Sequence, residues 1–303
     1  MFDKTQTYCF GRYLVDIPLD AELKGQGNLY QGARITTEKI GPQVLQARID
    51  KKRDALKQGT YAASYYQFKR EIKLENNGTI LLGYDDPFNT PMYSIDSFKW
   101  ERGMAFITSQ GAYDDKTIDA TVGRYSSYLR SLRYRAPRDI PTEPGFCINN
   151  GFIASDGKTS QVEKANLAFR VKNNQDVRIR IETEVRFRPW PSLLERQKKA
   201  RLDERFPGLI KTIRSGELTV NGLTGEESLT SFPSDDKTGD AHNFTWETLG
   251  EESNPLKPDI VLAITSGEGV AGVTGPSSMD TRQIQALYET IVKSIRLRPT
   301  GGQ

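Results

Sequence analysis

The most constraining feature of this sequence is a set of five short motifs that occurs twice in the same order. Cys9–Val15 recurs as Cys147–Ile153, and Pro42–Leu45 recurs as Pro191–Leu194. The other three pairs are Phe98–Glu101 with Phe244–Glu247, Ile107–Gly111 with Ile264–Gly269, and Ser131–Pro137 with Ser294–Pro299. Each copy is far longer than a solenoid repeat, so the repeated unit is a domain. We expect an N-terminal domain over 1–139 and a C-terminal domain over 145–303, joined by the linker-like segment Arg138–Gly145.

The polar and apolar pattern within each copy indicates an antiparallel sheet with helices. Apolar and polar residues alternate over Arg34–Ile40 and Val177–Glu182, which is typical of strands with one buried face. A helix is predicted to begin near Pro42 in the first copy and near Pro191 in the second, because proline is tolerated in the first helical turn. The second helix is expected to run to Ile210 and to be broken at Pro207–Gly208.

Local turn and cap signals complete the fold prediction. Asn77-Gly78 is a tight-turn signal, and Phe98–Thr108 is predicted to be a hairpin that turns near Arg102-Gly103. Asp280 with Gln283 resembles a capping box. Each copy closes on an apolar stripe at helical spacing: Ile118, Val122, Tyr125, Leu129 and Leu132, then Ile284, Leu287, Ile291 and Ile295. The sequence therefore predicts an α+β fold of two tandem related domains, each an antiparallel sheet with helices packed on one face.

Composition excludes several classes of protein. The 303 residues carry 42 basic and 39 acidic side chains in interspersed order. The densest basic runs, Lys51–Arg53 and Lys198–Arg201, lie in helical patterns, which favours a solvated helix face over a nucleic-acid surface. No run approaches the ~20 apolar residues that span a bilayer. No apolar run follows the first residue either, so the protein is cytosolic or an export segment has been removed.

Reactive side chains are scarce. Cys9 and Cys147 cannot form a zinc site by themselves, and the sequence leaves open whether they are two thiols or one disulfide. The only histidine, His242, lies in a polar segment and is predicted to be a surface residue. Glu226 and Glu227 are neighbours in a predicted strand and therefore point to opposite faces. We predict no catalytic residue, no metal site and no small-molecule substrate.

A glycine-rich motif raises the possibility of a nucleotide. Gly267, Gly269 and Gly272 match the G-x-G-x-x-G fingerprint after an apolar strand pattern. A dinucleotide loop opens a helix directly, but the next helix is predicted to begin only near Asp280. The first copy has two acidic residues in the matching segment, Ser109–Asp115. A strand-to-helix connection without a cofactor is therefore favoured over a nucleotide site.

The repeated motifs resemble a known family. Cys9–Pro18 is similar to the start of immunity proteins that type VI secretion bacteria make against their own lipase effectors. The C-terminal half resembles the same family in these segments: Gly145–Cys147, Gly151–Ile153, Ser192–Arg196, Val220–Glu227, Phe244–Glu247, Gly250 and Ser294–Pro299. The resemblance implies a claw-like, two-domain, non-catalytic protein. It would bind a phospholipase effector at its mobile lid, block substrate access and reside in the periplasm.

Candidate partner-binding residues are polar loop tips with aromatic neighbours. They are Tyr84, Asp85, Asp86, Tyr113, Asp114, Asp115, Asp235, Asp236, Glu251 and Glu252. The alternative function is a scaffold or adaptor of the cell envelope that binds another protein in the cleft between the two domains.

Overall fold

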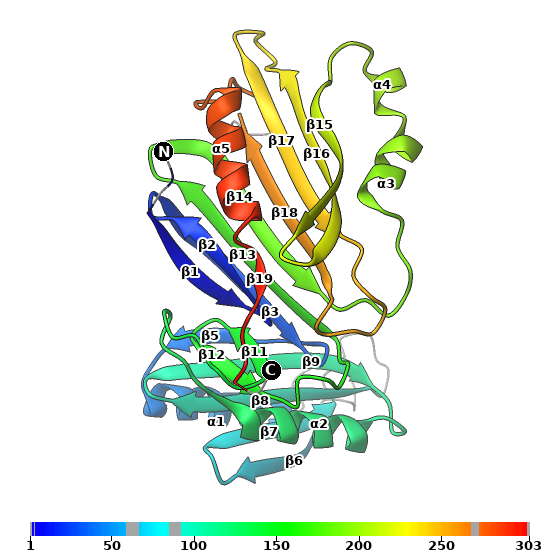
Figure 1. Cartoon of the computed structure of the whole chain (residues 1–303). Coiled ribbons are helices and arrows are strands. Elements are labelled where there is room, and N and C mark those ends of the chain that lie inside the picture. Colours follow the sequence, from blue (N-terminus) through cyan, green and yellow to red (C-terminus); the bar gives the residue numbers. More distant parts are fainter. Residues whose placement is uncertain (1, 3, 59–66, 85–91, 268–272, 302–303) are drawn as a thin grey trace. The chain divides into compact units, whose positions relative to one another are not determined.

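The computed structural model describes residues 2, 4–58, 67–84, 92–267 and 273–301, and the chain forms two compact units (Figure 1). Unit 1 is discontinuous and comprises Met1–Gln26 and Gly157–Gln303, whereas unit 2 is Gly27–Asp156. The described strands pair antiparallel and the α+β class is confirmed. The division at 1–139 and 145–303 remains a prediction about the sequence repeat, because the compact units assign the first 26 residues differently.

Unit 2 is built on a five-stranded antiparallel sheet. Its strand order is β5 (Thr36–Lys39), β9 (Met104–Tyr113), β8 (Tyr93–Glu101), β7 (Gly78–Tyr84) and β6 (Gln67–Leu74). The predicted hairpin turn is confirmed, because Arg102 and Gly103 join β8 to β9 with φ angles of 48° and 85°. A smaller sheet has the order β10 (Leu132–Tyr134), β12 (Gly151–Ala154) and β11 (Gly145–Ile148), and β4 (Ala33–Arg34) pairs with the end of β3 (Ala21–Tyr30).

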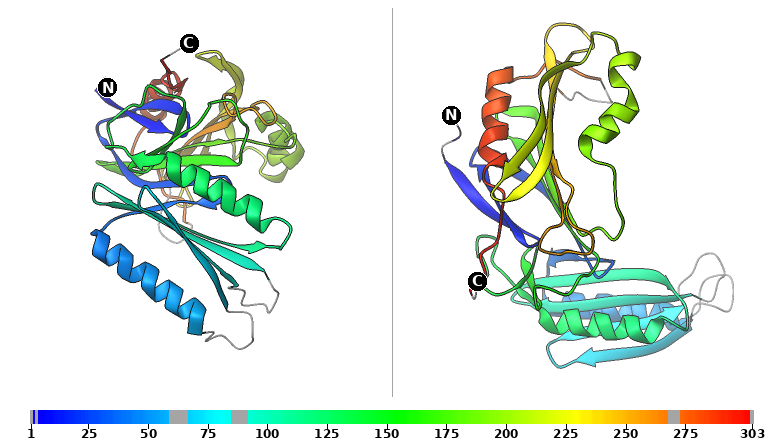
Figure 2. Two further views of the ribbon diagram at one scale, coloured as in Figure 1. Left: turned by 90° about the horizontal axis from the view of Figure 1, so that it is seen from below. Right: turned by 45° about the vertical axis from the view of Figure 1, so that its right-hand side comes forward.

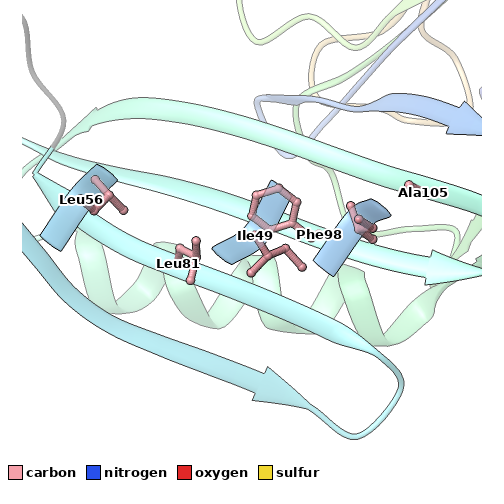
Figure 3. Packing of buried hydrophobic residues seen from close by; sticks show 6 residues of the cluster. Ile49, Leu56, Leu81, Phe98 and Ala105 are labelled. Atoms are coloured by element: carbon pink, nitrogen blue, oxygen red, sulfur yellow. The ribbon is translucent and has the colours of Figure 1, made fainter. Parts of the chain in front are cut away.

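The two helices of unit 2 cover opposite faces of the five-stranded sheet (Figure 2, left). Helix α1 (Pro42–Gln58) contributes to a cluster made of Leu45, Ile49, Leu56, Leu81, Phe98 and Ala105 (Figure 3). Helix α2 (Ile118–Ser131) packs on the other face, where the Tyr128 hydroxyl lies 2.7 Å from Ser97 Oγ and 3.2 Å from Thr108 Oγ1. This differs from the predicted placement on one face, since an apolar stripe shows that a helix has a buried side but not which side of the sheet it covers.

Unit 1 is built on a larger antiparallel sheet. The order in its large sheet is β15 (Lys211–Val220), β16 (Leu223–Pro233), β17 (Asp240–Thr248), β18 (Asp259–Ser266), β14 (Asn174–Glu184), β13 (Glu163–Val171) and the first part of β3. Helix α5 (Thr281–Val292) and the pair α3 (Leu193–Ala200) and α4 (Leu202–Arg205) lie on opposite faces of this sheet (Figure 2, right).

Helix α5 forms the core of unit 1 with the large sheet. The predicted capping box is present: the Asp280 side chain accepts from Gln283 N at 2.8 Å, and the Gln283 side chain accepts from Asp280 N at 2.9 Å. Ile284, Leu287 and Ile291 are fully buried as predicted. Each such side chain contributes roughly 1.5–3 kcal/mol of burial free energy.

The helix after Pro191 differs from its prediction. It begins at the capping box of Ser192 and Glu195 and ends at Ala200, because Arg201 adopts a left-handed conformation with φ of 50°. One further turn, α4, ends at Arg205. The prediction of a helix to Ile210, broken at Pro207–Gly208, is therefore wrong. Pro207 still limits the helix, since a residue before proline, here Phe206, disfavours helical backbone angles.

A strand near the C-terminus pairs with a strand of the N-terminal segment within unit 1. Strands β1 (Thr5–Phe10), β2 (Tyr13–Pro18) and β19 (Arg296–Leu297) form one sheet in that order. Arg12, between β1 and β2, donates from Nε and Nη2 to the Glu163 carboxylate at 2.8 and 2.7 Å, and both side chains are buried. Such bidentate pairing satisfies charges that would otherwise be costly to bury.

Candidate partner-binding surfaces

Three tyrosines lie side by side at one end of the sheet in unit 2. Tyr84 on β7 pairs with Tyr93 on β8, which pairs with Tyr113 on β9. The Tyr84 and Tyr93 ring centroids are 4.5 Å apart, and the Tyr113 hydroxyl lies 3.5 Å from that of Tyr125. All three tyrosines of this row are partly exposed. Partly exposed tyrosines that neighbouring rings hold in place are typical anchors of protein interfaces.

Charged groups border the tyrosine row. Lys69 Nζ lies 4.3 Å from the centre of the Tyr84 ring, within range of a cation–π interaction. Hydrogen bonding with Tyr84, and then with Asp115, raises the pKa of Tyr93, so this hydroxyl stays neutral. The structure thus brings the predicted residues Tyr84, Tyr113 and Asp115 together. Asp85 and Asp86 lie outside the described residues.

Asp114, one of the predicted partner-binding residues, is hydrogen-bonded within the protein. Its Oδ1 accepts from Thr117 N at 2.9 Å and from Thr117 Oγ1 at 2.7 Å, just before α2 begins. These hydrogen bonds lower the pKa of Asp114. The carboxylate therefore stabilises the entry into α2, although it remains exposed.

The predicted acidic residues of unit 1 do not form one site. Asp235 and Asp236 precede β17, and Glu251 and Glu252 follow it, so the strand separates the two pairs. Asp236 Oδ1 accepts from Ser234 Oγ and Thr238 N at 2.6 and 3.0 Å. Asp235 accepts from the backbone N–H of Thr274 at 2.8 Å, and Glu251 pairs with Lys257. All four are exposed; Asp236 and Glu251 order their own loops, and Asp235 binds the segment before α5.

An exposed aromatic loop next to Glu251 was not predicted. Phe187 and Trp190 are 42% and 55% exposed, and Leu249 on the adjacent loop is 53% exposed. Arg186 holds this loop: its guanidinium lies 5.2 Å from the Trp190 ring, and its carbonyl accepts from Ser253 N at 2.7 Å. The sequence signal was present in the Phe187–Pro191 segment (FRPWP), which combines aromatic, arginine and proline residues before a helix cap.

A groove between α3–α4 and the outer face of β15, β16 and β17 was also not predicted. Its volume is about 640 Å³. Backbone N–H of Leu194 donates to Glu226 Oε2 at 2.8 Å, and Arg196 donates to both oxygens of Glu247 at 2.9 and 2.6 Å. Glu227 points to the opposite face, where the Tyr288 hydroxyl donates to it at 2.9 Å. The predicted separation of Glu226 from Glu227 is thereby confirmed.

His242 is buried, and its predicted surface position is wrong. Nδ1 lies 2.9 Å from Ser266 Oγ, and Nε2 lies 3.0 Å from Thr281 Oγ1. Burial lowers the pKa of His242, so the ring is neutral at pH 7. His242 lines neither the groove nor a cavity of about 530 Å³ that lies beside Arg214 and Lys293. The imidazole instead links β17, β18 and the start of α5.

The glycine motif is described only at its first residue. Gly267 has φ of +77°, its N–H donates to Asp176 Oδ2 at 2.9 Å, and its carbonyl accepts from Gly275 N at 2.7 Å. Gly269 and Gly272 lie outside the described residues. Helix α5 begins at Thr281, as the capping-box prediction requires, and not at the glycines.

Three general features bear on function. Both Cys9 and Cys147 are disulfide-bonded, which the sequence had left open. Within the part of the chain that the structure describes, no cluster of three histidine, cysteine, aspartate or glutamate side chains is suited to a metal ion. The helices in that part are also too short or too polar to cross a membrane.

Three solved structures are similar to this chain over 99% of its length. One is the apo immunity protein TplEi of the T6SS from Pseudomonas aeruginosa, with 28% identity, a TM-score of 0.88, and coverage of 99% of this chain and 100% of that one. A chain in the crystal structure of the Tle4–Tli4 complex matches with 26% identity, the same TM-score and the same coverage. TplEi bound to an "L" peptide matches with 27% identity, a TM-score of 0.82 and the same coverage.

Family profiles agree with these structures. No curated protein sequence matches the chain. The N-terminal domain of Tle cognate immunity protein 4 matches residues 6–135, and the C-terminal domain of that protein matches residues 139–300. The resemblance drawn from the repeated motifs is thereby confirmed. The chain belongs to the Tle cognate immunity protein 4 family.

Proposed function

We propose that this protein neutralises a cognate type VI lipase effector by binding it and catalyses no reaction itself. The observation that carries this proposal is the match over 99% of the chain to a structure from an effector–immunity complex. Membership of a cognate immunity family supports it independently. An inhibitor of this kind needs a large, well-packed interface of roughly 1,600 Å² or more rather than reactive groups.

The finer mechanism that we propose is occlusion of the effector's lid and substrate entrance. The tyrosine row and the other predicted loop residues are candidates for the contact. Tyrosine and tryptophan anchors contribute most when they become fully buried at the centre of an interface. A lower affinity of Tyr84→Ala for the effector would support a role of the tyrosine row in binding. An unchanged affinity would contradict that role.

For the compartment we propose the periplasm. The support is that Cys9 and Cys147 are both disulfide-bonded, because structural disulfides persist in oxidising compartments and are rare in the cytosol.

The test is an inhibition assay with the lipase encoded beside this protein. We expect lipase activity to fall in proportion to added protein until the two are equimolar, and the two proteins to elute together in size-exclusion chromatography. An unrelated secreted lipase is the control and should keep its activity. Co-elution without inhibition would favour the adaptor alternative, and the absence of a complex at micromolar concentrations would refute the proposal.

A further inference from the structure

The groove in unit 1 is open because α3 is fixed at only one end. Its N-terminal turn is held by Glu226 and Glu247 from the sheet, and the Glu247 carboxylate keeps the pKa of Arg196 above its usual value. Leu193 is the only residue of α3 that is buried. The C-terminal half of α3 and the following turn therefore stand away from the strands and leave the space of about 640 Å³.

The floor of the groove is polar. Thr212, Thr230 and Asn243 form a row across β15, β16 and β17, and Ser215 and Ser228 form the next row. Hydroxyl and amide groups of this kind donate to backbone carbonyls and carboxylates. A sheet face that serves only as a solvated surface does not require the helices α3 and α4 to be held over it. A bound segment of polypeptide would contact both the strands that form the floor and the helices that form the wall.

Apolar side chains also line the groove, from α4, from the segment before β15 and from the end of β16. Leu202, Ile210 and Phe232 line the groove, and the neighbouring Phe206 and Leu209 are 41% and 51% exposed. These residues favour an occupant that carries apolar side chains as well as polar groups, because such a concave surface binds by burying apolar area.

The charge of the groove is positive. Lys198 and Arg201 line it against a single lining carboxylate, Glu204, which is already paired with Arg201. Lys198 has no carboxylate partner among the side chains that the structure describes. Lys211 adds exposed positive charge at the start of β15. Two residues of the basic run noted in the sequence, Lys198 and Arg201, thus line the groove, whereas Lys199 does not.

We propose that this groove binds an acidic segment of the cognate effector that also carries apolar side chains. The inference rests on the proposed function and assigns a second contact, separate from the tyrosine row. Charge complementarity selects an acidic partner, and it increases the association rate more than it slows dissociation.

The experiment compares two adjacent charge reversals in the full-length protein. Lys198 lines the groove, whereas Lys199 is also exposed but is not part of the lining. We expect Lys198→Glu to weaken effector binding about tenfold, mostly through a slower association rate with a reduced salt dependence. Lys199→Glu should stay within about twofold of the wild type. Asn243→Trp, which fills the groove floor, should weaken binding without changing any charge.

The possible results separate this proposal from the proposed function. If the wild type binds the effector and all three variants bind equally well, the groove proposal is wrong while the proposed function stands. If the wild type does not bind, the proposed function fails first. A fluorescent single-stranded oligonucleotide serves as the competing probe. Tight binding of it that Lys198→Glu abolishes, with unchanged effector affinity, would overturn the acidic-segment proposal. Thermal melts establish that each variant is folded.

Discussion

At the scale of single residues, Lys99 and the Arg12–Glu163 pair show how a buried charge is stabilised in this protein. Lys99 is buried, and its ammonium donates to the carbonyl of Leu129 at 2.9 Å and to that of Leu132, at the C-terminal end of α2. Burial lowers the pKa of Lys99, but these carbonyls and the helix dipole favour its charged form. In the Arg12–Glu163 pair, two buried charged side chains neutralise each other and share two hydrogen bonds.

The prediction of a surface position for His242 was wrong for an identifiable reason. Its neighbours in the sequence are polar, so local composition predicted a surface position. Its actual environment is created by Ser266 and Thr281, which lie 24 and 39 residues away in the sequence. Burial by partners that distant is a tertiary effect, which single-sequence patterns do not contain.

His242 also makes the stability dependent on pH. Burial lowers its folded-state pKa below the unfolded value, despite the opposing charges of Asp240, Asp280 and Asp176. As the pH falls below about 6.5, the unfolded chain takes up the proton first, so stability falls until the folded-state pKa is reached. We expect the melting temperature to fall between pH 7.5 and 5.5, and to fall less in His242→Gln.

His242→Gln should also lower the free energy of unfolding by about 1 kcal/mol at pH 7.5, because a hydrogen bond is lost. Since His242 is the only histidine, a single imidazole signal in the NMR spectrum gives its pKa directly. A value at or above 6.5 would contradict the argument.

At the scale of secondary structure, elements with local signals were predicted and elements set by packing were not. Arg102-Gly103 and the Asp280 cap were located correctly because turn and cap chemistry involve only a few adjacent residues. The break at Arg201 was missed because arginine carries no signal for a left-handed conformation. The face that each helix covers was missed because sequence periodicity does not specify it.

The Asp280 cap should stabilise unit 1 measurably. Asp280→Ala removes the acceptor for Gln283 N and is expected to lower the free energy of unfolding by about 1 kcal/mol in urea titrations. Asp280→Asn keeps the acceptor and should stay within a few tenths of a kcal/mol of the wild type. Equal losses in the two variants would show that the charge, and not the cap, is responsible.

At the scale of the whole molecule, the sequence predicted the family and the paired domains better than the binding surfaces. Tyr84 and Tyr113 could be proposed as partner-binding residues because aromatic residues beside acidic loop tips are visible in the sequence. The Lys198 groove was not found, since its floor comes from β15, β16 and β17 and exists only after the sheet has assembled. The Trp190 loop was not predicted because its segment, Phe187–Pro191, contains no acidic residue.

The two ways of dividing the chain predict different stable fragments. Residues 1–26 joined to 157–303 by a flexible linker should unfold cooperatively in urea. Residues 145–303 alone leave Glu163 buried without Arg12, at a cost of about 3–5 kcal/mol, and leave β19 without β2. That cost is a large part of the roughly 5–15 kcal/mol that stabilises a domain. Equal midpoints for the two fragments would instead support the boundary at Gly145.

The antiparallel pairing of β2 with β19 also has a consequence for biogenesis. Arg296 and Leu297 are synthesised long after Tyr13 and Leu14, yet they complete the sheet that Tyr13 and Leu14 begin. Unit 1 therefore cannot close until β19 has been synthesised, and the nascent polypeptide stays incompletely folded while the intervening strands and helices are made. A chain in that state is a suitable substrate for any translocation channel that admits only unfolded polypeptides.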